Sequence, residues 1–182
     1  TPLPPVSVRT APGAPAGNAD SWDGYRSARR RVFDMVERHK VPNFVVLTGD
    51  VHSSWAFDLP RQLSEGYDSA SGRGSLGVEV TCPAVSSLPP FQGDDVPARL
   101  ERMRAVRPHL KFLDGQSRGY VVIEMTRDRL QADWWFVPTV KEHSSEQRFA
   151  KGLVCEADSR HLTEASGPMP PATGPDPAPK PV

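Results

Sequence analysis

The clearest apolar pattern lies in the first third of the chain, where a helical stripe is followed by a short continuous apolar run. The stripe has the i, i+4, i+7, i+8, i+11 spacing of an amphipathic helix and comprises Ala28, Val32, Met35, Val36 and His39. Pro42 disfavours helical geometry at Val41, so we expect the helix to end near Lys40. Residues 44–47 are all apolar, which is typical of a central strand covered on both faces. A helix followed directly by such a strand predicts an α/β fold.

Weaker patterns predict the other elements. A strand is expected at residues 76–81, a short amphipathic helix within 95–107, and a hairpin of strands 119–126 and 130–137. Residues 61–77 are rich in Ser and Gly and are expected to form a surface loop. Trp134 and Trp135 are adjacent on the second hairpin strand, so one should be buried and the other partly exposed.

Proline content divides the chain into three parts. Five of the first fifteen residues and seven of the last fifteen are proline, out of 20 prolines among 182 residues. Proline-rich segments lack backbone donors and apolar content, so we expect residues 1–19 and 163–182 to be extended or disordered. The foldable domain is therefore predicted to span residues 20–162.

Charge and hydropathy exclude several classes of partner. The 22 basic and 22 acidic residues balance, without a basic patch, so we expect no nucleic-acid partner. No apolar run reaches the roughly 18 residues that a membrane span requires, so we expect no membrane partner. The arginines at 29–31 resemble an export signal, but Asp34 and Glu37 follow them where a signal peptide is apolar. They are interpreted as the solvated face of a helix, and no signal peptide is visible.

The two cysteines leave two interpretations open. Cys82 and Cys155 could form one disulfide, which would fit an oxidising compartment. Both have apolar neighbours, so they could equally be small buried thiols.

The candidate chemistry follows the apolar run directly, at Gly49-Asp50-Val51-His52. In α/β sheets, ligands bind beyond the carboxyl ends of strands, and Gly49 permits a sharp exit from the strand. In extended backbone, side chains two residues apart point the same way, so Asp50 and His52 should face one point. A carboxylate and an imidazole suit iron, manganese or zinc, or an acid–base pair. The alternative is a plain turn in which Asp50 caps a backbone amide.

Three blocks in this order resemble the PhoD-like alkaline phosphatases. They are Ser-Trp-Asp-Gly-Tyr at residues 21–25, Val-Val-Leu-Thr-Gly-Asp-Val-His-Ser-Ser-Trp at 45–55, and Pro-His-Leu-Lys-Phe-Leu-Asp at 108–114, which continues into Arg-Gly-Tyr-Val-Val at 118–122. The resemblance covers about residues 20–140 and corresponds to the C-terminal part of that family's catalytic domain. It implies part of a metallophosphatase-type β-sandwich with flanking helices, and a metal-dependent phosphoesterase.

The resemblance also assigns expected roles to individual residues. Asp50 and His52 match metal-site and catalytic positions, with iron and calcium expected as cofactors and other divalent metals as alternatives. Residues that match family motifs near the site, without an assigned role, are Trp22, Asp23, Tyr25, Arg29, His109 and Asp114. For His109 and Asp114, packing and loop hydrogen bonding are alternatives to catalysis, and for Arg29 the alternative to a phosphate contact is a solvated helix face. The resemblance to this family also implies a phosphate ester substrate and a secreted or periplasmic location.

Most of the family's metal ligands belong to motifs of an N-terminal half that we do not find here. We therefore expect a fragment that works as a phosphoesterase only when the missing N-terminal half completes it. Two ligands are fewer than the three protein groups that a catalytic metal usually takes. The alternative is a truncated, catalytically inactive remnant or a structural module that needs an upstream segment.

Overall fold

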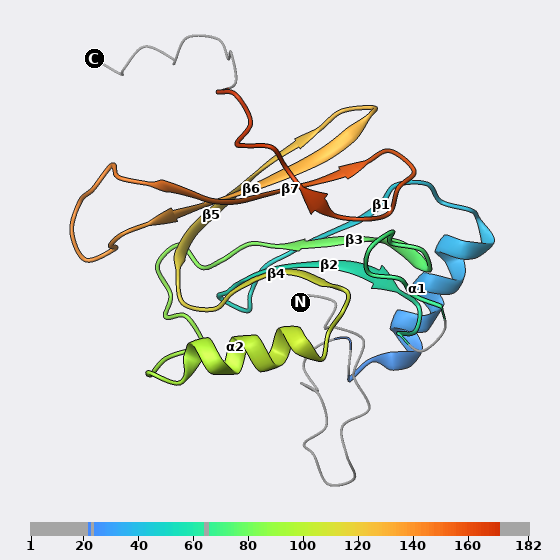
Figure 1. The fold of residues 1–182 in the computed structure, drawn as a ribbon, viewed down its shortest axis with the longest axis horizontal. Helices are drawn as coiled ribbons and strands as arrows, with labels where there is room; N and C mark the ends of the chain where they lie inside the picture. The colour runs from blue at the N-terminus through green and yellow to red at the C-terminus, as the bar shows by residue number, and fades with distance from the viewer. Residues whose placement is uncertain (1–21, 23, 64–65, 172–182) are drawn as a thin grey trace, which may run out of the picture.

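The computed structural model describes residues 22, 24–63 and 66–171, which form two packed β-sheets with helices on the outside of one of them (Figure 1). In chain order the elements are α1 (Arg26–Arg38), β1 (Phe44–Thr48), β2 (Ser54–Pro60), β3 (Ser75–Thr81), α2 (Val96–Ala105), β4 (Leu110–Asp114), β5 (Arg118–Met125), β6 (Arg129–Val137), β7 (Arg148–Glu156) and β8 (Thr163–Glu164). The proline-rich segment predicted at residues 1–19 lies outside the described residues. Mixed sheets with few helices agree with the predicted α/β class.

The first sheet has the strand order β1-β3-β2-β4, with β1 parallel to β3 and the other pairs antiparallel. Gly77 of β3 lies opposite Phe44 of β1, where a side chain would collide with the Phe44 carbonyl. Among the described residues β1 has a partner on one edge only, so within this chain it is an edge strand and not the central strand predicted at 44–47. Its apolar run reflects two covered faces: Val45 packs toward the second sheet and Val46 toward α1.

The second sheet has the order β5-β6-β7-β8 and is antiparallel throughout. The hairpin predicted from residues 119–137 is present as β5 and β6. Trp134 is fully buried and Trp135 is partly exposed, which confirms the predicted division between them.

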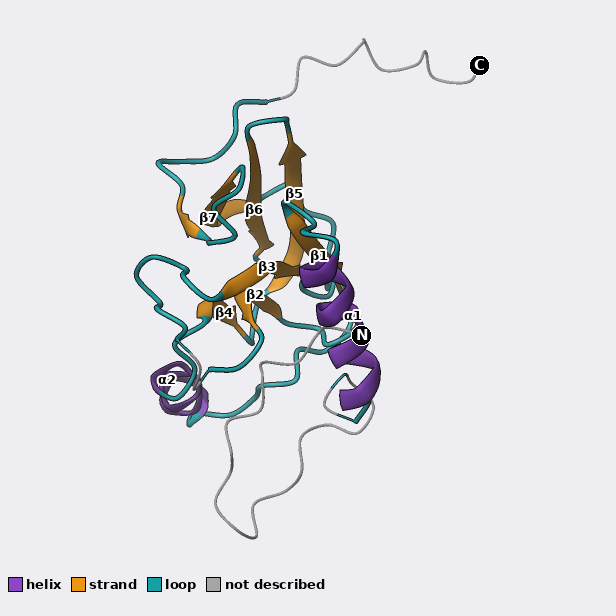
Figure 2. Cartoon of the chain, turned by 90° about the vertical axis from the view of Figure 1, so that its right-hand side faces the viewer, coloured by secondary structure: helices purple, strands orange, loops and turns teal. Residues whose placement is uncertain are grey.

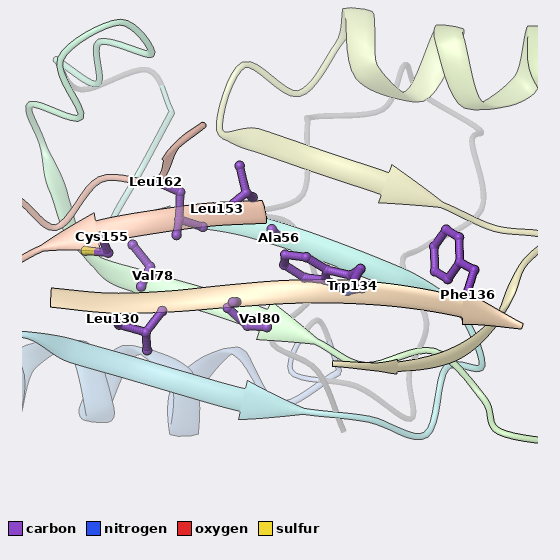
Figure 3. Packing of buried hydrophobic residues seen from close by; sticks show 10 residues of the cluster. Ala56, Val78, Val80, Leu130, Trp134, Phe136, Leu153, Cys155 and Leu162 are labelled. Atoms are coloured by element: carbon purple, nitrogen blue, oxygen red, sulfur yellow. The ribbon is translucent and has the colours of Figure 1, made fainter. Parts of the chain in front are cut away.

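The main core lies between the two sheets and is centred on Trp134 (Figure 3). Ala56, Val78 and Val80 contribute from the first sheet, and the tilted Phe112 ring lies 5.0 Å from the Trp134 ring. The indole N–H of Trp134 donates to the Thr81 carbonyl at 3.2 Å, so its one polar group is satisfied. Burial of a side chain of this size stabilises the fold by roughly 3 kcal/mol.

Helix α1 covers the outer face of the first sheet. Phe33 and Val36 are buried against the sheet, in a cluster with Phe57 and Leu76. Met35, which the sequence placed on the buried stripe, is 58% exposed. The buried face of α1 is therefore turned toward Phe33 and away from Met35.

The cysteines are not paired. Cys155 is buried on β7 and belongs to the core between the sheets, whereas Cys82 is exposed after β3, and both are free thiols. The interpretation as a small buried thiol therefore holds for Cys155 and not for Cys82.

A buried carboxylate, Asp58, anchors the chain after β7 to the first sheet. Its side chain is fully buried; Oδ2 lies 2.7 Å from His161 Nδ1 and Oδ1 accepts the Leu162 N–H at 2.9 Å. The Tyr67 hydroxyl donates to Oδ2 at 2.8 Å, and Lys111 Nζ lies 3.4 Å away. Burial and the neighbouring Asp58 carboxylate both raise the pKa of Tyr67, so it remains a donor.

The ordered chain also extends past the predicted boundary at residue 162. Thr163 pairs with Val154 in β8, and the Met169 N–H donates to Asp133 Oδ2 at 2.6 Å. Gln131 Nε2 donates to the Gly167 carbonyl at 3.0 Å. These contacts to β6 and β7 hold residues that the composition assigned to the tail, and residues 172–182 lie outside the described part.

Within the described residues, none of the helices combines the length and apolar character that crossing a bilayer requires.

Replacing Asp58 by Ala should lower the free energy of unfolding by about 3–5 kcal/mol, because the buried donors around it lose their acceptor. Urea denaturation followed by circular dichroism measures this. The control is Asp95→Ala, which removes an exposed carboxylate 3.9 Å from Arg99 and should cost less than about 1 kcal/mol. Equal effects of the two substitutions would contradict the anchoring role of Asp58.

Candidate functional site

The carboxyl ends of β1 and β3 meet the start of β2 and the end of β4 at one end of the two-sheet stack. Because β1 and β3 are parallel, their exits are neighbours, and the Cys82 N–H donates to the Thr48 carbonyl at 3.0 Å. Ser54 at the start of β2 lies opposite Asp114 at the end of β4. Asp50 and His52 lie in the bend that joins β1 to β2 at this end (Figure 1).

The bend itself differs from the extended backbone that the sequence predicted. Asp50 and His52 both have left-handed backbone, with φ of 74° and 55°, and both side chains are exposed. The argument that alternation aims them at one point is therefore wrong. Asp50 and His52 instead lie in a tight turn at the strand end. Asp158 and Arg160 after β7 form a second left-handed pair within three positions, so this backbone conformation does not by itself mark a functional site.

A buried serine holds this turn in place. Ser53 is 1% exposed; its hydroxyl donates to the Val51 carbonyl at 3.0 Å and accepts the Trp55 indole N–H at 2.7 Å. Gly49, at the other side of the turn, packs so closely on Cys82 that a β-carbon there would lie 3.3 Å from the Cys82 sulfur. A side chain at position 49 would therefore need a small shift of the exposed Cys82 thiol, which lies beside the turn.

A buried carboxylate that the sequence analysis missed lies under the turn. Glu79 of β3 is fully buried, and Thr48, the last residue of β1, donates its hydroxyl to Glu79 Oε1 at 2.9 Å. The Thr48 and Thr81 hydroxyls are also 2.9 Å apart. A lone Glu within the apolar strand at 76–81 was the available signal. This polar cluster fixes the ends of β1 and β3, from which the turn departs.

His109 lies away from the turn. It precedes β4, its carbonyl accepts the Asp58 N–H at 2.9 Å, and all of β4 separates it from Asp114 at the site end. The imidazole is 1% exposed and stacks on Phe57 with ring centroids 5.5 Å apart. Neither ring nitrogen has a hydrogen-bond partner among the described residues. Burial, with Arg107 and Lys111 adding to it, lowers the pKa of His109 to about 4, so the ring is neutral at pH 7.

Asp114 is at the site end but serves its own loop. Its Oδ1 accepts the N–H groups of Gln116 and Ser117 at 3.0 and 2.7 Å, and its Oδ2 accepts the Ser117 hydroxyl at 3.1 Å. The loop hydrogen bonding considered for Asp114 is therefore confirmed.

The remaining motif residues precede α1 or lie in its first turn. Trp22 packs against the cluster under α1, and Tyr25 is 63% exposed just before the helix begins. Arg29 lies one turn into α1 and is partly exposed, and Asp23 lies outside the described residues. Figure 1 shows α1 running roughly opposite to β1, so these residues belong to the helix end farther from the start of β1.

The described residues do not complete a metal site. Among them there is no group of three or more His, Cys, Asp and Glu side chains placed to hold a metal ion. Asp50 and His52 offer one carboxylate and one imidazole, which suit a transition metal by donor type but fall short of three ligands. Any such centre needs donors from beyond the described residues.

Comparison with known proteins matches residues 2–134 to the family described as PhoD-like phosphatase. This chain belongs to that family. The PhoD-like chain is 30% identical to alkaline phosphatase D of Bacillus subtilis (strain 168) over 153 residues, which is 84% of this chain and 25% of that protein. A solved structure of PhoD superposes with a TM-score of 0.68 at 29% identity, covering 82% of this chain and 27% of that chain.

The PhoD-like chain therefore spans about a quarter of the length of the relatives it matches.

The buried imidazole predicts an acid-sensitive fold. The unfolded chain binds a proton at His109 near pH 6.5 and the folded chain only near pH 4. Stability is therefore complete above pH 6.5 and falls as the pH is lowered toward 4, by up to about 3 kcal/mol. Urea midpoints across this range should show the slope in the native chain and a smaller slope in His109→Phe.

The control is His143→Phe, which replaces an exposed loop histidine and should keep the native profile. An unchanged slope in His109→Phe would show that other groups cause the acid sensitivity.

Proposed function

We propose that this chain is the C-terminal part of a metal-dependent phosphoesterase, in which Asp50 and His52 supply part of the metal site. The observation that carries the proposal is the 30% identity to alkaline phosphatase D over 84% of the chain, which includes the left-handed turn at the end of β1. Iron and calcium are the proposed metals, with other divalent ions as alternatives. Phosphate monoesters and diesters are the proposed substrates, and a secreted or periplasmic location is proposed from family habit.

Within this proposal the turn positions the side chains of Asp50 and His52 as two metal donors. His52 holds a metal through its imidazole, and Asp50 is either a second ligand or the group that orients His52. The Ser53 hydrogen bonds stabilise the turn, and the Thr48–Glu79 hydrogen bond stabilises the strand end that precedes it. The remaining ligands belong to the missing N-terminal half of the domain.

The two sheets leave their open edges on the same flank, which supports a missing half. In the described residues β1 pairs only with β3, and β5 pairs only with β6. A cavity lined by Phe44 and Val45 of β1 also has Met125 of β5, Leu130 of β6 and Cys155 of β7 in its lining, so it lies between the start of β1 and one end of the second sheet. Figure 2 shows β1 and β5 on one side, with β4 and β7 on the other.

Exposed apolar side chains mark this flank, which we call the open flank. Leu47 lies on the same side of β1 as Val45 yet is 51% exposed, and Met125 at the end of β5 is 56% exposed. The opposite flank is closed, because Asp58 of β2 holds His161 after β7. We propose that the N-terminal half docks on the open flank and extends both sheets into a complete metallophosphatase-type sandwich.

The isolated chain should show negligible hydrolysis of a chromogenic phosphate ester with iron and calcium, because its ligand set is incomplete. Replacing the C-terminal quarter of alkaline phosphatase D by this chain should give an active enzyme. In it Asp50→Asn and His52→Asn should each lower kcat by at least about 100-fold, while asparagine tolerates the left-handed backbone. The control is Asp128→Asn, in the exposed β5–β6 turn.

Three results would count against this assignment. A chimera that folds but is inactive, when the parent enzyme is active under the same conditions, would contradict the phosphoesterase role. Full activity in His52→Asn removes His52 from the site. Metal-dependent turnover by the isolated chain, lost in His52→Asn, shows that the ligand set is complete without another half.

The open flank predicts a specific docking defect. Leu47→Glu places a charge on the edge strand and should weaken association between this chain and the separately expressed remainder of alkaline phosphatase D by at least about tenfold. Analytical ultracentrifugation of the mixture measures it. Val140→Glu, at a 40% exposed apolar residue beyond β6, is the control and should bind as the native chain does. Equal binding by both variants would place the contact elsewhere.

A further inference from the structure

A second cavity, of about 270 Å³, opens between the start of β5 and the end of β6. Its polar lining comes from Gln116, Ser117, Arg118, Thr139 and Arg148, and the lining contains no Asp or Glu. We call it the arginine pocket. Two guanidinium groups without a carboxylate give the arginine pocket a positive charge.

The two arginines are positioned by uncharged partners. Arg118, the first residue of β5, donates its Nε to the Ser87 carbonyl at 2.9 Å. Arg148, the first residue of β7, has its guanidinium carbon 5.3 Å from the centre of the Phe136 ring. Neither forms an ion pair with another described residue, whereas Arg61 pairs with Asp34 and Glu37 on the opposite part of the fold. Their charge is thus oriented but not neutralised.

Several neutral donors near the arginine pocket are already used. The Ser117 N–H and hydroxyl and the Gln116 N–H all donate to Asp114, so they are not free to bind a ligand. Asp114 itself does not line the arginine pocket. Thr139 adds a second hydroxyl from the segment after β6.

The arginine pocket lies at the same end of the stack as the turn of Asp50 and His52. Gly119, next to Arg118, donates its N–H at 3.0 Å to the carbonyl of Ala84, two residues after Cys82. Cys82 in turn pairs with Thr48 at the end of β1. A short chain of backbone contacts therefore links the pocket to the candidate site.

We propose that the arginine pocket binds a tetrahedral oxyanion of the phosphate class, either free phosphate or the phosphate group of an ester. Guanidinium groups bind phosphate oxygens with paired, charge-assisted hydrogen bonds, and the Gln116 side-chain amide and the Thr139 hydroxyl are the neutral donors that the lining adds. The cavity is large enough for such a group. The anion site rests on the pocket, and the choice of phosphate over carboxylate rests on the proposed function.

The test is a titration of the 182-residue chain with inorganic phosphate, in EDTA, followed by amide shifts in ¹H–¹⁵N spectra. Saturable shifts are expected at residues 116–118 and 148. Arg148→Gln should raise the Kd for phosphate at least about tenfold. The matched control is Arg129→Gln: Arg129 also begins a strand of the second sheet, but pairs with Glu124 at 3.3 Å, and its loss should leave the Kd unchanged.

Parallel titrations with glycerol phosphate and acetate identify the ligand class. Binding of both phosphate compounds, with acetate at least about tenfold weaker, supports the phosphate class. No saturable shifts, shifts confined to residues 50–53, equal losses in the two arginine variants, or acetate binding as tightly as phosphate would each overturn the inference. The titration contains EDTA and measures no turnover. Phosphate binding in this titration, together with an inactive chimera, would therefore contradict the proposed function but not the anion site.

Discussion

The packing of the two sheets on each other is the constraint on which the rest of this chain depends. Trp134 reaches across from the second sheet and bonds the backbone of Thr81 in the first, at the end of the stack where β1 and β3 finish. Apolar packing alone tolerates sliding, but one directed hydrogen bond from a buried indole fixes the register of the two layers. The Asp58 contact to His161 does the same at the far end. Hydrogen bonds of Trp134 and Asp58 thus join the two layers at two separate places across an apolar interface.

The two packed sheets support the tight turn of Asp50 and His52 at the end of β1. Asp50 and His52 both have left-handed backbone, which is uncommon for residues other than glycine, and the neighbouring Ser53, Trp55 and Thr48 are held by hydrogen bonds. In a chain of a quarter of the relatives' length, such a turn has no evident packing benefit, since both side chains face solvent.

Much of the fold could be predicted from local patterns. Helix α1, strands β1 and β3 and the β5–β6 hairpin have periodicity that a short window reveals. Strand β2 was missed because its buried Asp58 and terminal Pro60 do not read as strand residues. Strand β7 was missed because Lys151 and Gly152 interrupt its apolar alternation. Apolar content indicates which faces of a strand are covered, not how many neighbouring strands it pairs with. The edge position of β1 could therefore not be predicted.

The candidate site was predictable in its residue types and not in its geometry. Gly-Asp-Val-His after an apolar strand indicated where donors lie, but the left-handed bend that carries them is next to hydrogen bonds of Ser53 and Trp55 that no local pattern reveals. The Asp58 anchor joins residues 103 positions apart, which no local window detects. His109 appeared in a motif beside site residues, yet the register of β4 carries it to the opposite end of the sheet.

The left-handed turn also shapes how these two positions can vary over evolution. Each must satisfy a backbone demand that glycine, asparagine and aspartate meet most easily, whatever the side chain does. A histidine retained at position 52 therefore resists a conformational pressure toward smaller residues, while an aspartate at 50 meets no such conflict. Variation among relatives would consequently be more informative at His52 than at Asp50, because only there do shape and chemistry pull in different directions.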